Sequence, residues 1–94
     1  MIFSFADALT KQVFHGLHTP RVRKLLPSSE LLSAAERRLD LLNSVENMES
    51  LSEIPALHTE VVRDGREMYS IPINKDHRIT FRWNDGNAHN VEIK

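Results

Sequence analysis

Two arginines four residues apart, Arg78 and Arg82, are the side chains best suited to bind a phosphate. They lie in residues 78–83, where apolar and polar residues alternate as in a β-strand. Because alternate strand residues point to the same side of a sheet, both guanidinium groups are predicted to share one face. Guanidinium groups bind phosphate oxygens in forked geometry, so this face is a candidate phosphate-binding site. The simpler alternative is that one arginine pairs with a carboxylate and covers the sheet.

The charges are unevenly distributed along the sequence. The net charge is −1, from 12 Lys and Arg and 13 Asp and Glu residues, which argues against a general nucleic-acid-binding protein. However, residues 28–60 are mainly acidic, whereas both ends of the chain are basic. The last third contributes the cations Arg63, Arg66, Lys75, Arg78, Arg82 and Lys94. If they converge, they form a local phosphate-binding patch; otherwise they belong to an ordinary mixed surface.

The composition excludes several other kinds of site. The sequence has no cysteine, so disulfide bonds and thiolate metal sites are ruled out. His77 and His89 are too isolated to predict a metal site, because zinc needs three or four converging ligands. Residues 1–5 lack the basic start and the long apolar run of a signal peptide or membrane span. We therefore expect one cytoplasmic domain, residues 1–94, without a metal.

The first half of the sequence predicts a short strand followed by two helices. Residues 2–5 are apolar and aromatic, as in a strand, and apolar residues recur at helical spacing through residues 8–17. Residues 29–45 contain no Gly or Pro and carry one apolar stripe, which predicts the longest helix. Residues 46–60, interrupted by Pro55, are expected to form a packed connection.

The last third predicts an antiparallel meander. Residues 69–73 and 78–83 alternate with a period of two, and Asp85-Gly86 is a strong turn signal before a further strand at residues 88–93. The predicted fold class is α+β, with two N-terminal helices on one face of a twisted antiparallel sheet, in the order β-α-α-β-β-β with room for one further strand. The opposite face is left for function, and Trp83, of opposite parity to the arginines, is predicted to belong to the core.

Residues 70–81, Ser-Ile-Pro-Ile-Asn-Lys-Asp-His-Arg-Ile-Thr-Phe, resemble the signature of HigB-like killer proteins. In that signature, Ser-Ile, a strand, Asn, two variable residues, an aromatic, Arg, Ile or Leu, and Phe follow at this spacing; here His77 replaces the aromatic. Further similarities are the opening Met-Ile-x-Ser-Phe, the helix at residues 35–42, the Leu57-His58 pair and residues 90–93. The sequence is thus identified as a member of the HigB-like branch of the RelE/ParE toxin superfamily.

The resemblance implies a RelE-like fold and the toxin of a type II toxin–antitoxin system. Such toxins cut translated mRNA on the ribosome without a metal or other cofactor. They are neutralised by a HigA-like helix-turn-helix antitoxin, with which they form hetero-oligomers such as heterotetramers.

Cutting RNA without a metal requires the 2′-hydroxyl to attack the neighbouring phosphate, so a proton acceptor, a proton donor and cations are needed. Arg78 matches the arginine of the family signature, which implies phosphate stabilisation, and we expect it to face a hollow that accepts a ribose-phosphate backbone. His58 matches a histidine of several relatives when one residue is inserted before Tyr69, which implies proton transfer. The candidates for binding RNA phosphates are Arg82, Arg63, Arg66, Lys75 and Lys94.

The sequence also departs from the family pattern. Many relatives have Asp-Tyr-His after the strand that matches residues 91–93, whereas Lys94 follows here, and Val61 or Val62 replaces the loop lysine. The remaining groups either suffice for slow cleavage or leave a catalytically weak or inactive binding protein. Such a protein would block a target such as gyrase, as in the ParE branch, and a free-standing regulatory domain is a third alternative.

Overall fold

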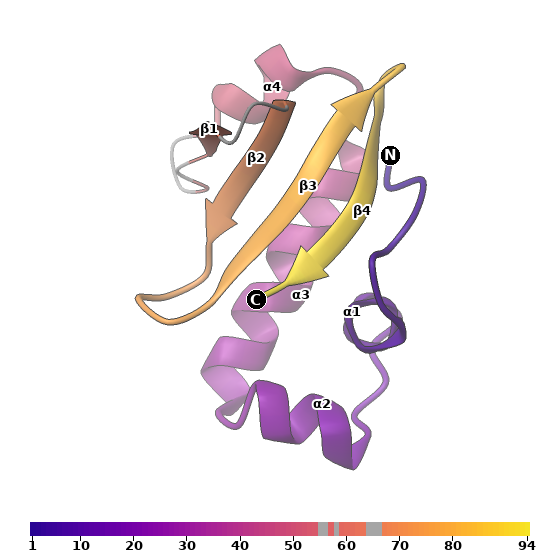
Figure 1. Cartoon of the computed structure of the whole chain (residues 1–94). Helices are drawn as coiled ribbons and strands as arrows, with labels where there is room; N and C mark the ends of the chain where they lie inside the picture. The colour runs from indigo at the N-terminus through magenta and orange to yellow at the C-terminus, as the bar shows by residue number, and fades with distance from the viewer. Residues whose placement is uncertain (55–56, 58, 64–66) are drawn as a thin grey trace.

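The chain forms a helical layer and a β-sheet, as the computed structural model in Figure 1 shows. The structure describes residues 1–54, 57, 59–63 and 67–94. Within these residues, four helices come first and four strands follow, so the fold class is α+β, as the sequence predicts. The helices are α1 (Ala8–Phe14), α2 (Pro20–Leu25), α3 (Ser29–Ser44) and α4 (Met48–Ser52).

Each of these helices begins next to a polar side chain that caps it. The side-chain oxygens of Asp7, Thr19, Ser28 and Asn47 each accept a hydrogen bond from the backbone N–H three residues later. The long helix α3 confirms the prediction for residues 29–45. The prediction of only two helices was wrong, because α2 and α4 have six and five residues and are too short to show an apolar period.

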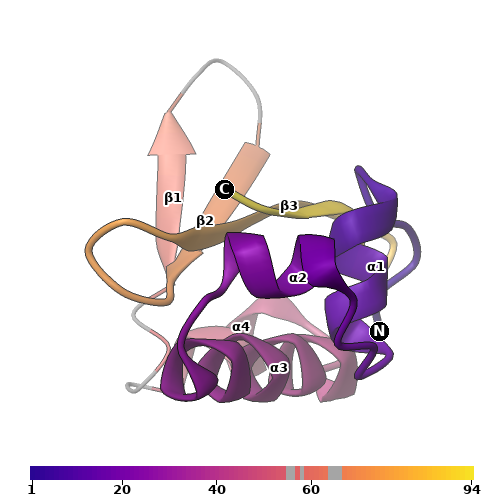
Figure 2. The same cartoon turned by 90° about the horizontal axis from the view of Figure 1, so that it is seen from below.

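Helix α3 supplies the helical side of the hydrophobic core. Its residues Ala35, Leu39 and Leu42 are fully buried, and α3 runs along one face of the sheet (Figure 2). The sheet contributes the buried side chains of Ile71, Ile79, Phe81, Ala88, Val91 and Ile93. Trp83 packs against this cluster and is partly buried, which confirms its predicted place in the core.

The sheet is an antiparallel meander in the order β1-β2-β3-β4. Its strands are β1 (Glu60–Arg63), β2 (Glu67–Pro72), β3 (Arg78–Asn84) and β4 (Asn87–Ile93). The prediction of a meander is confirmed, with β1 as the additional strand.

The predicted turn between β3 and β4 is present. Asp85 and Gly86 both have positive φ, 50° and 78°, which is the geometry that joins antiparallel strands with two residues. The tight turn fixes the pairing of Asn84 with Asn87 and Arg82 with His89.

Replacing Gly86 by alanine is expected to lower the free energy of unfolding by about 1–2 kcal/mol, because an L-residue is strained in the left-handed region. An added Cβ would lie 3.5 Å from the carbonyl oxygen of Glu46, an ordinary contact, so strain alone sets this cost. Urea denaturation measures it. Gly16→Ala is the control, because Gly16 has a similar φ of 73° in open space; a much larger loss for Gly86→Ala would contradict the explanation.

The predicted strand at residues 2–5 is not a continuous strand. Only two isolated parallel bridges form, Ile2 with Ala88 and Phe5 with Val91. The pairing is interrupted because β4 bulges at Asn90, whose φ is 53°, and the Asn90 N–H donates to the side-chain oxygen of Ser4 rather than to a backbone carbonyl. The N-terminal segment therefore lines the β4 edge without completing a regular ladder.

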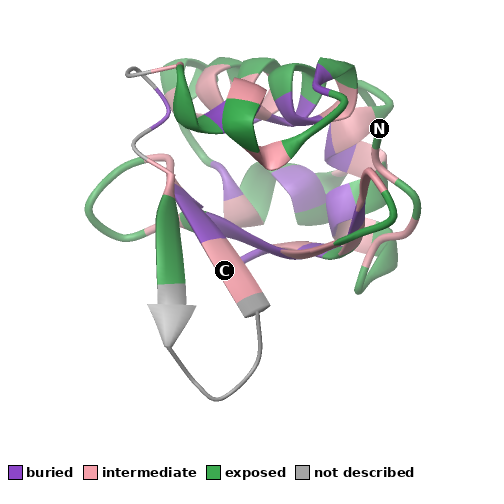
Figure 3. Cartoon of the chain, turned by 90° about the horizontal axis from the view of Figure 1, so that it is seen from above, coloured by how far each residue is buried: buried purple, intermediate pink, exposed green. Residues whose placement is uncertain are grey.

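The helices lie on one side of the sheet, as predicted, and the opposite side is free of helices in the described part of the chain (Figures 2 and 3). Helix α3 covers the sheet, whereas α1 contacts both α3 and β4. The helix-free side is the open face of the sheet, and it is the side that the sequence was predicted to leave for function.

Candidate functional site

The strand register defines which side chains share the open face. Residues paired across antiparallel strands point to the same side. Three successive rows of such pairs carry the candidate groups, each row about 7 Å from the next at 3.4 Å per strand residue. The rows are Pro72–Arg78–Lys94, Glu60–Ser70–Thr80–Glu92 and Met68–Arg82–His89.

The first row brings Arg78 beside Lys94. The Arg78 N–H donates to the Lys94 carbonyl oxygen at 3.0 Å, and the Lys94 N–H donates to the Arg78 carbonyl oxygen at 2.8 Å. Both side chains are exposed. Two of the cations predicted to bind phosphate are therefore neighbours on the open face.

The bulge at Asn90 creates this pairing. The register between β3 and β4 shifts by one residue between Thr80 and Arg82, so that Ile79 pairs with Ile93. Without the extra residue, Val91 and Ile93 would point to the open face, because a one-residue slip reverses every side chain. The bulge therefore keeps both apolar residues in the core and places Lys94 opposite Arg78.

The third row contains Arg82 and His89. Arg82 lies on the same face as Arg78, as the alternation predicts, and its Cα is about 14 Å away at 3.4 Å per strand residue. His89 is its cross-strand partner. The His89 ring packs against Phe3 with centroids 4.7 Å apart, and its Nε2 lies 3.3 Å from the carbonyl oxygen of Asn84. These contacts hold the imidazole at the edge of the open face.

The middle row separates these two cationic rows. It contains the carboxylates Glu60 and Glu92 at its ends and the hydroxyls of Ser70 and Thr80 at its centre. A carboxylate beside two cationic rows is a potential proton acceptor. The sequence pattern did not predict Glu92 as a site residue, and His89 was considered only as a metal ligand, because the bulge puts the two on the same face although they are three residues apart. The signal was the apolar spacing of Ala88, Val91 and Ile93, which breaks strict alternation.

No carboxylate of the described residues forms a salt bridge with the Arg78 guanidinium group. The close contact between a basic side chain and a carboxylate that is found there joins His18 Nε2 to Glu36 Oε1 at 3.1 Å, between α3 and the loop before α2. The alternative in which a carboxylate holds Arg78 is therefore not observed in the described part of the chain. Among the described residues, no salt bridge keeps the Arg78 guanidinium group from a phosphate.

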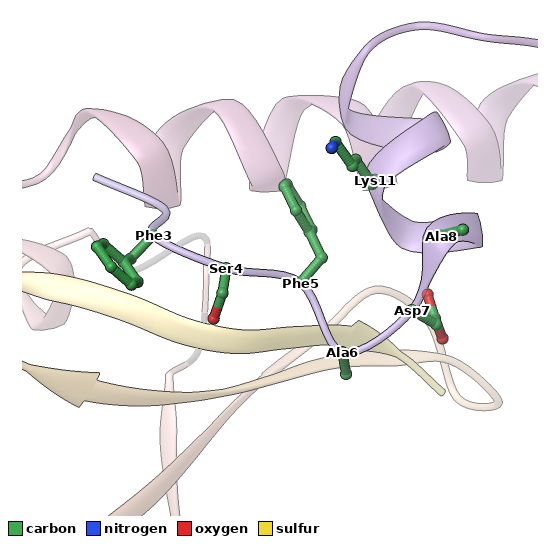
Figure 4. Close-up of a pocket in the computed structure, with 7 residues that line it drawn as sticks. All are labelled: Phe3, Ser4, Phe5, Ala6, Asp7, Ala8 and Lys11. Atoms are coloured by element: carbon green, nitrogen blue, oxygen red, sulfur yellow. The ribbon is translucent and has the colours of Figure 1, made fainter.

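Four hollows in the described part of the chain lie away from Arg78, and none of them is the hollow expected around it. They are lined mostly by residues of the N-terminal segment, α1, α2 and the start of α3. The largest of these four, about 520 Å³, lies between residues 3–8 and Lys11 (Figure 4). Arg78 instead stands on an exposed sheet surface, because the helices that would form walls lie on the other side.

The remaining predicted site residues do not join these rows. Lys75 is exposed in the loop between β2 and β3, where Asn74 Oδ1 accepts hydrogen bonds from the N–H groups of Asp76 and His77. The side chain of Arg63 and the whole of His58 and Arg66 lie outside the described residues. Among the described residues, no three His, Cys, Asp or Glu side chains gather as metal ligands would.

These features define a class of small α+β protein in which helices cover one face of an antiparallel sheet and cations occupy the other. A family model described as the RelE-like toxin of the type II toxin–antitoxin system HigB matches residues 2–94. The chain belongs to the HigB-like toxin family, which confirms the resemblance found in the sequence.

A relative from Haemophilus influenzae, described as an uncharacterized protein, is 30% identical over 66 residues. The match spans 69% of this chain and 65% of the relative, just under two thirds of the relative's length. In the described part of the chain, the helices are all too short or too polar to cross a membrane.

Proposed function

We propose that the chain is the toxin of a type II toxin–antitoxin system and cuts translated mRNA on the ribosome. Membership of the HigB-like family supports the toxin role, and a RelE-like fold agrees with the α+β architecture. The observation that carries the nuclease proposal is the open face, where Arg78 and Lys94 form one cationic row and Arg82 and His89 another. Single-stranded RNA brings successive phosphates to such a surface.

The chemistry is attack of a ribose 2′-hydroxyl on the adjacent phosphorus. A bond forms between the 2′-oxygen and phosphorus, and the bond to the 5′-oxygen of the next nucleotide breaks, which leaves a 2′,3′-cyclic phosphate and a 5′-hydroxyl. Negative charge grows on the phosphoryl oxygens during attack, and Arg78 with Lys94 stabilises it. Arg82 holds a neighbouring phosphate by forked hydrogen bonds.

Two groups on the open face are suited to the proton transfers. Glu92 lies in the middle row and accepts the proton of the 2′-hydroxyl, while His89 in the adjacent row donates a proton to the leaving 5′-oxygen. His58 stays a candidate from the family resemblance. Cleavage without a metal is what the family resemblance implies.

The type II family supports a protein antitoxin as partner, and the family resemblance suggests its kind. A HigA-like helix-turn-helix antitoxin neutralises the chain in a hetero-oligomer such as a heterotetramer, and the ribosome presents the mRNA in the cytoplasm.

Expression of the chain without its antitoxin tests this proposal. We expect growth arrest and transcripts cut within translated regions, detected by mapping RNA 5′ ends. Healthy cells with intact transcripts would remove the nuclease role. Growth arrest with DNA damage signalling and intact transcripts would instead indicate a gyrase-blocking protein of the ParE kind.

A further inference from the structure

Two buried hydroxyls at the centre of the open face have no hydrogen-bond partner among the described residues. Ser70 on β2 is fully buried and Thr80 on β3 is 5% exposed, and the two residues are direct cross-strand partners. In the part of the chain that the structure describes, neither Ser70 Oγ nor Thr80 Oγ1 has a hydrogen-bond partner. Buried polar side chains are nearly always satisfied, so two adjacent exceptions require an explanation.

Thr10 is a useful comparison, because its hydroxyl is also buried but has a hydrogen-bond partner. Thr10 is also fully buried, and its Oγ1 accepts a hydrogen bond from the Ile93 N–H at 3.0 Å. That hydroxyl joins α1 to β4 and has a structural role. Ser70 and Thr80 make no such connection to the described residues. Apolar side chains of similar size at these two positions would avoid the free-energy cost of an unsatisfied buried hydroxyl.

The position of the pair points to a ligand. Ser70 and Thr80 lie between the Arg78–Lys94 row and the Arg82–His89 row, about 7 Å from each at 3.4 Å per strand residue. An RNA strand that lies across both rows therefore passes over the hydroxyls. A hydroxyl donates well to a charged phosphate oxygen, and that hydrogen bond is stronger than one between neutral groups.

The hydroxyl oxygens are covered in the free chain, so the subsite must open. The neighbours that can cover it on the same face are Met68, Arg82 and Glu92, all of them partly buried. Long side chains of this kind change rotamer readily. Arg82 is one of these side chains, because it is partly buried and lies two residues from Thr80 on the same face of β3.

We propose that Ser70 and Thr80 form a phosphate subsite that donates two hydrogen bonds to a phosphodiester oxygen of single-stranded RNA. This inference rests on the proposed function and adds to it the two hydroxyls that bind the phosphate between the cationic rows. The hydroxyls are left unsatisfied in the free chain and are satisfied when RNA binds.

The test compares Thr80→Val and Ser70→Ala with the control Thr10→Val. The probe is a single-stranded 2′-O-methyl RNA, which keeps its phosphates and cannot be cut by 2′-hydroxyl attack; binding is followed by fluorescence anisotropy and stability by thermal unfolding. Loss of a hydrogen bond to a charged group is expected to weaken binding by about tenfold in each site variant. The melting temperature of Thr80→Val should stay the same or rise.

Thr10→Val is expected to do the reverse, with a lower melting temperature and unchanged RNA binding, because it loses a satisfied hydrogen bond away from the open face. The subsite is overturned if both site variants bind the RNA as tightly as the wild-type chain does. It is also overturned if Thr80→Val is destabilised like Thr10→Val, since the hydroxyl would then have a structural partner. A wild-type chain that does not bind the RNA would also overturn the subsite, whereas the proposed function, in which the ribosome presents the mRNA, is tested separately by expression of the chain without its antitoxin.

Discussion

Replacement of Arg78 by alanine is expected to reduce mRNA cleavage by about 100- to 1,000-fold, the usual effect of removing one group that stabilises a developing oxyanion. Arg78 is exposed, lies beside Lys94 and is not held by a carboxylate within the described residues. Its loss therefore removes charge stabilisation from the phosphorane without disturbing the core. Cleavage rates in a translation reaction, with growth of the expressing cells, measure this effect.

The control for this prediction is Arg37→Ala. Arg37 is an exposed arginine on α3, on the helical side of the sheet, so its removal changes the net charge equally and leaves the open face intact. Both variants should unfold at about the wild-type temperature. Equal losses of cleavage in the two variants would mean that overall charge, rather than the Arg78 position, determines activity.

Replacement of Phe81 by alanine is expected to have the largest effect on stability, a loss of about 3–5 kcal/mol in the free energy of unfolding. Phe81 is fully buried and stacks on Tyr69 with ring centroids 5.7 Å apart. Because small domains are stable by only about 5–15 kcal/mol, the variant should be partly unfolded at growth temperature. Chemical denaturation measures the loss, and toxicity should fall with it although no open-face residue has changed.

Phe3→Ala is the matched control, since Phe3 is 70% exposed and the same atoms are removed from the surface. Its expected cost is within about 0.5 kcal/mol. If Phe81→Ala were no more destabilising than Phe3→Ala, the core described between α3 and the sheet would be wrong.

Long periodic elements were predictable from the sequence. Helix α3 spans more than four turns with an apolar stripe, and β3 alternates over seven residues, so each signal repeats often enough to be recognised. The same alternation correctly placed Arg78 and Arg82 on one face and Trp83 on the other. The tight Asp85-Gly86 turn identified the β3–β4 hairpin.

Short and context-dependent features were not predictable in the same way. Helices α2 and α4 depend on their caps and on packing, and the bulge at Asn90 depends on a local backbone conformation with positive φ. That single bulge determines that Lys94 faces Arg78 and that His89 and Glu92 share the open face. Some residues of the candidate site could therefore be predicted from the sequence. The register of β3 and β4, which brings them together, required the structure.

The chemical ends of the cut RNA test the central claim most directly. Translating ribosomes programmed with one defined mRNA are incubated with the purified chain, and the ends of the fragments are identified by mass spectrometry. Attack by the 2′-hydroxyl across the open face predicts a 2′,3′-cyclic phosphate on the upstream fragment and a 5′-hydroxyl on the downstream one. Intact mRNA, or fragments with a 3′-hydroxyl and a 5′-phosphate, would contradict it.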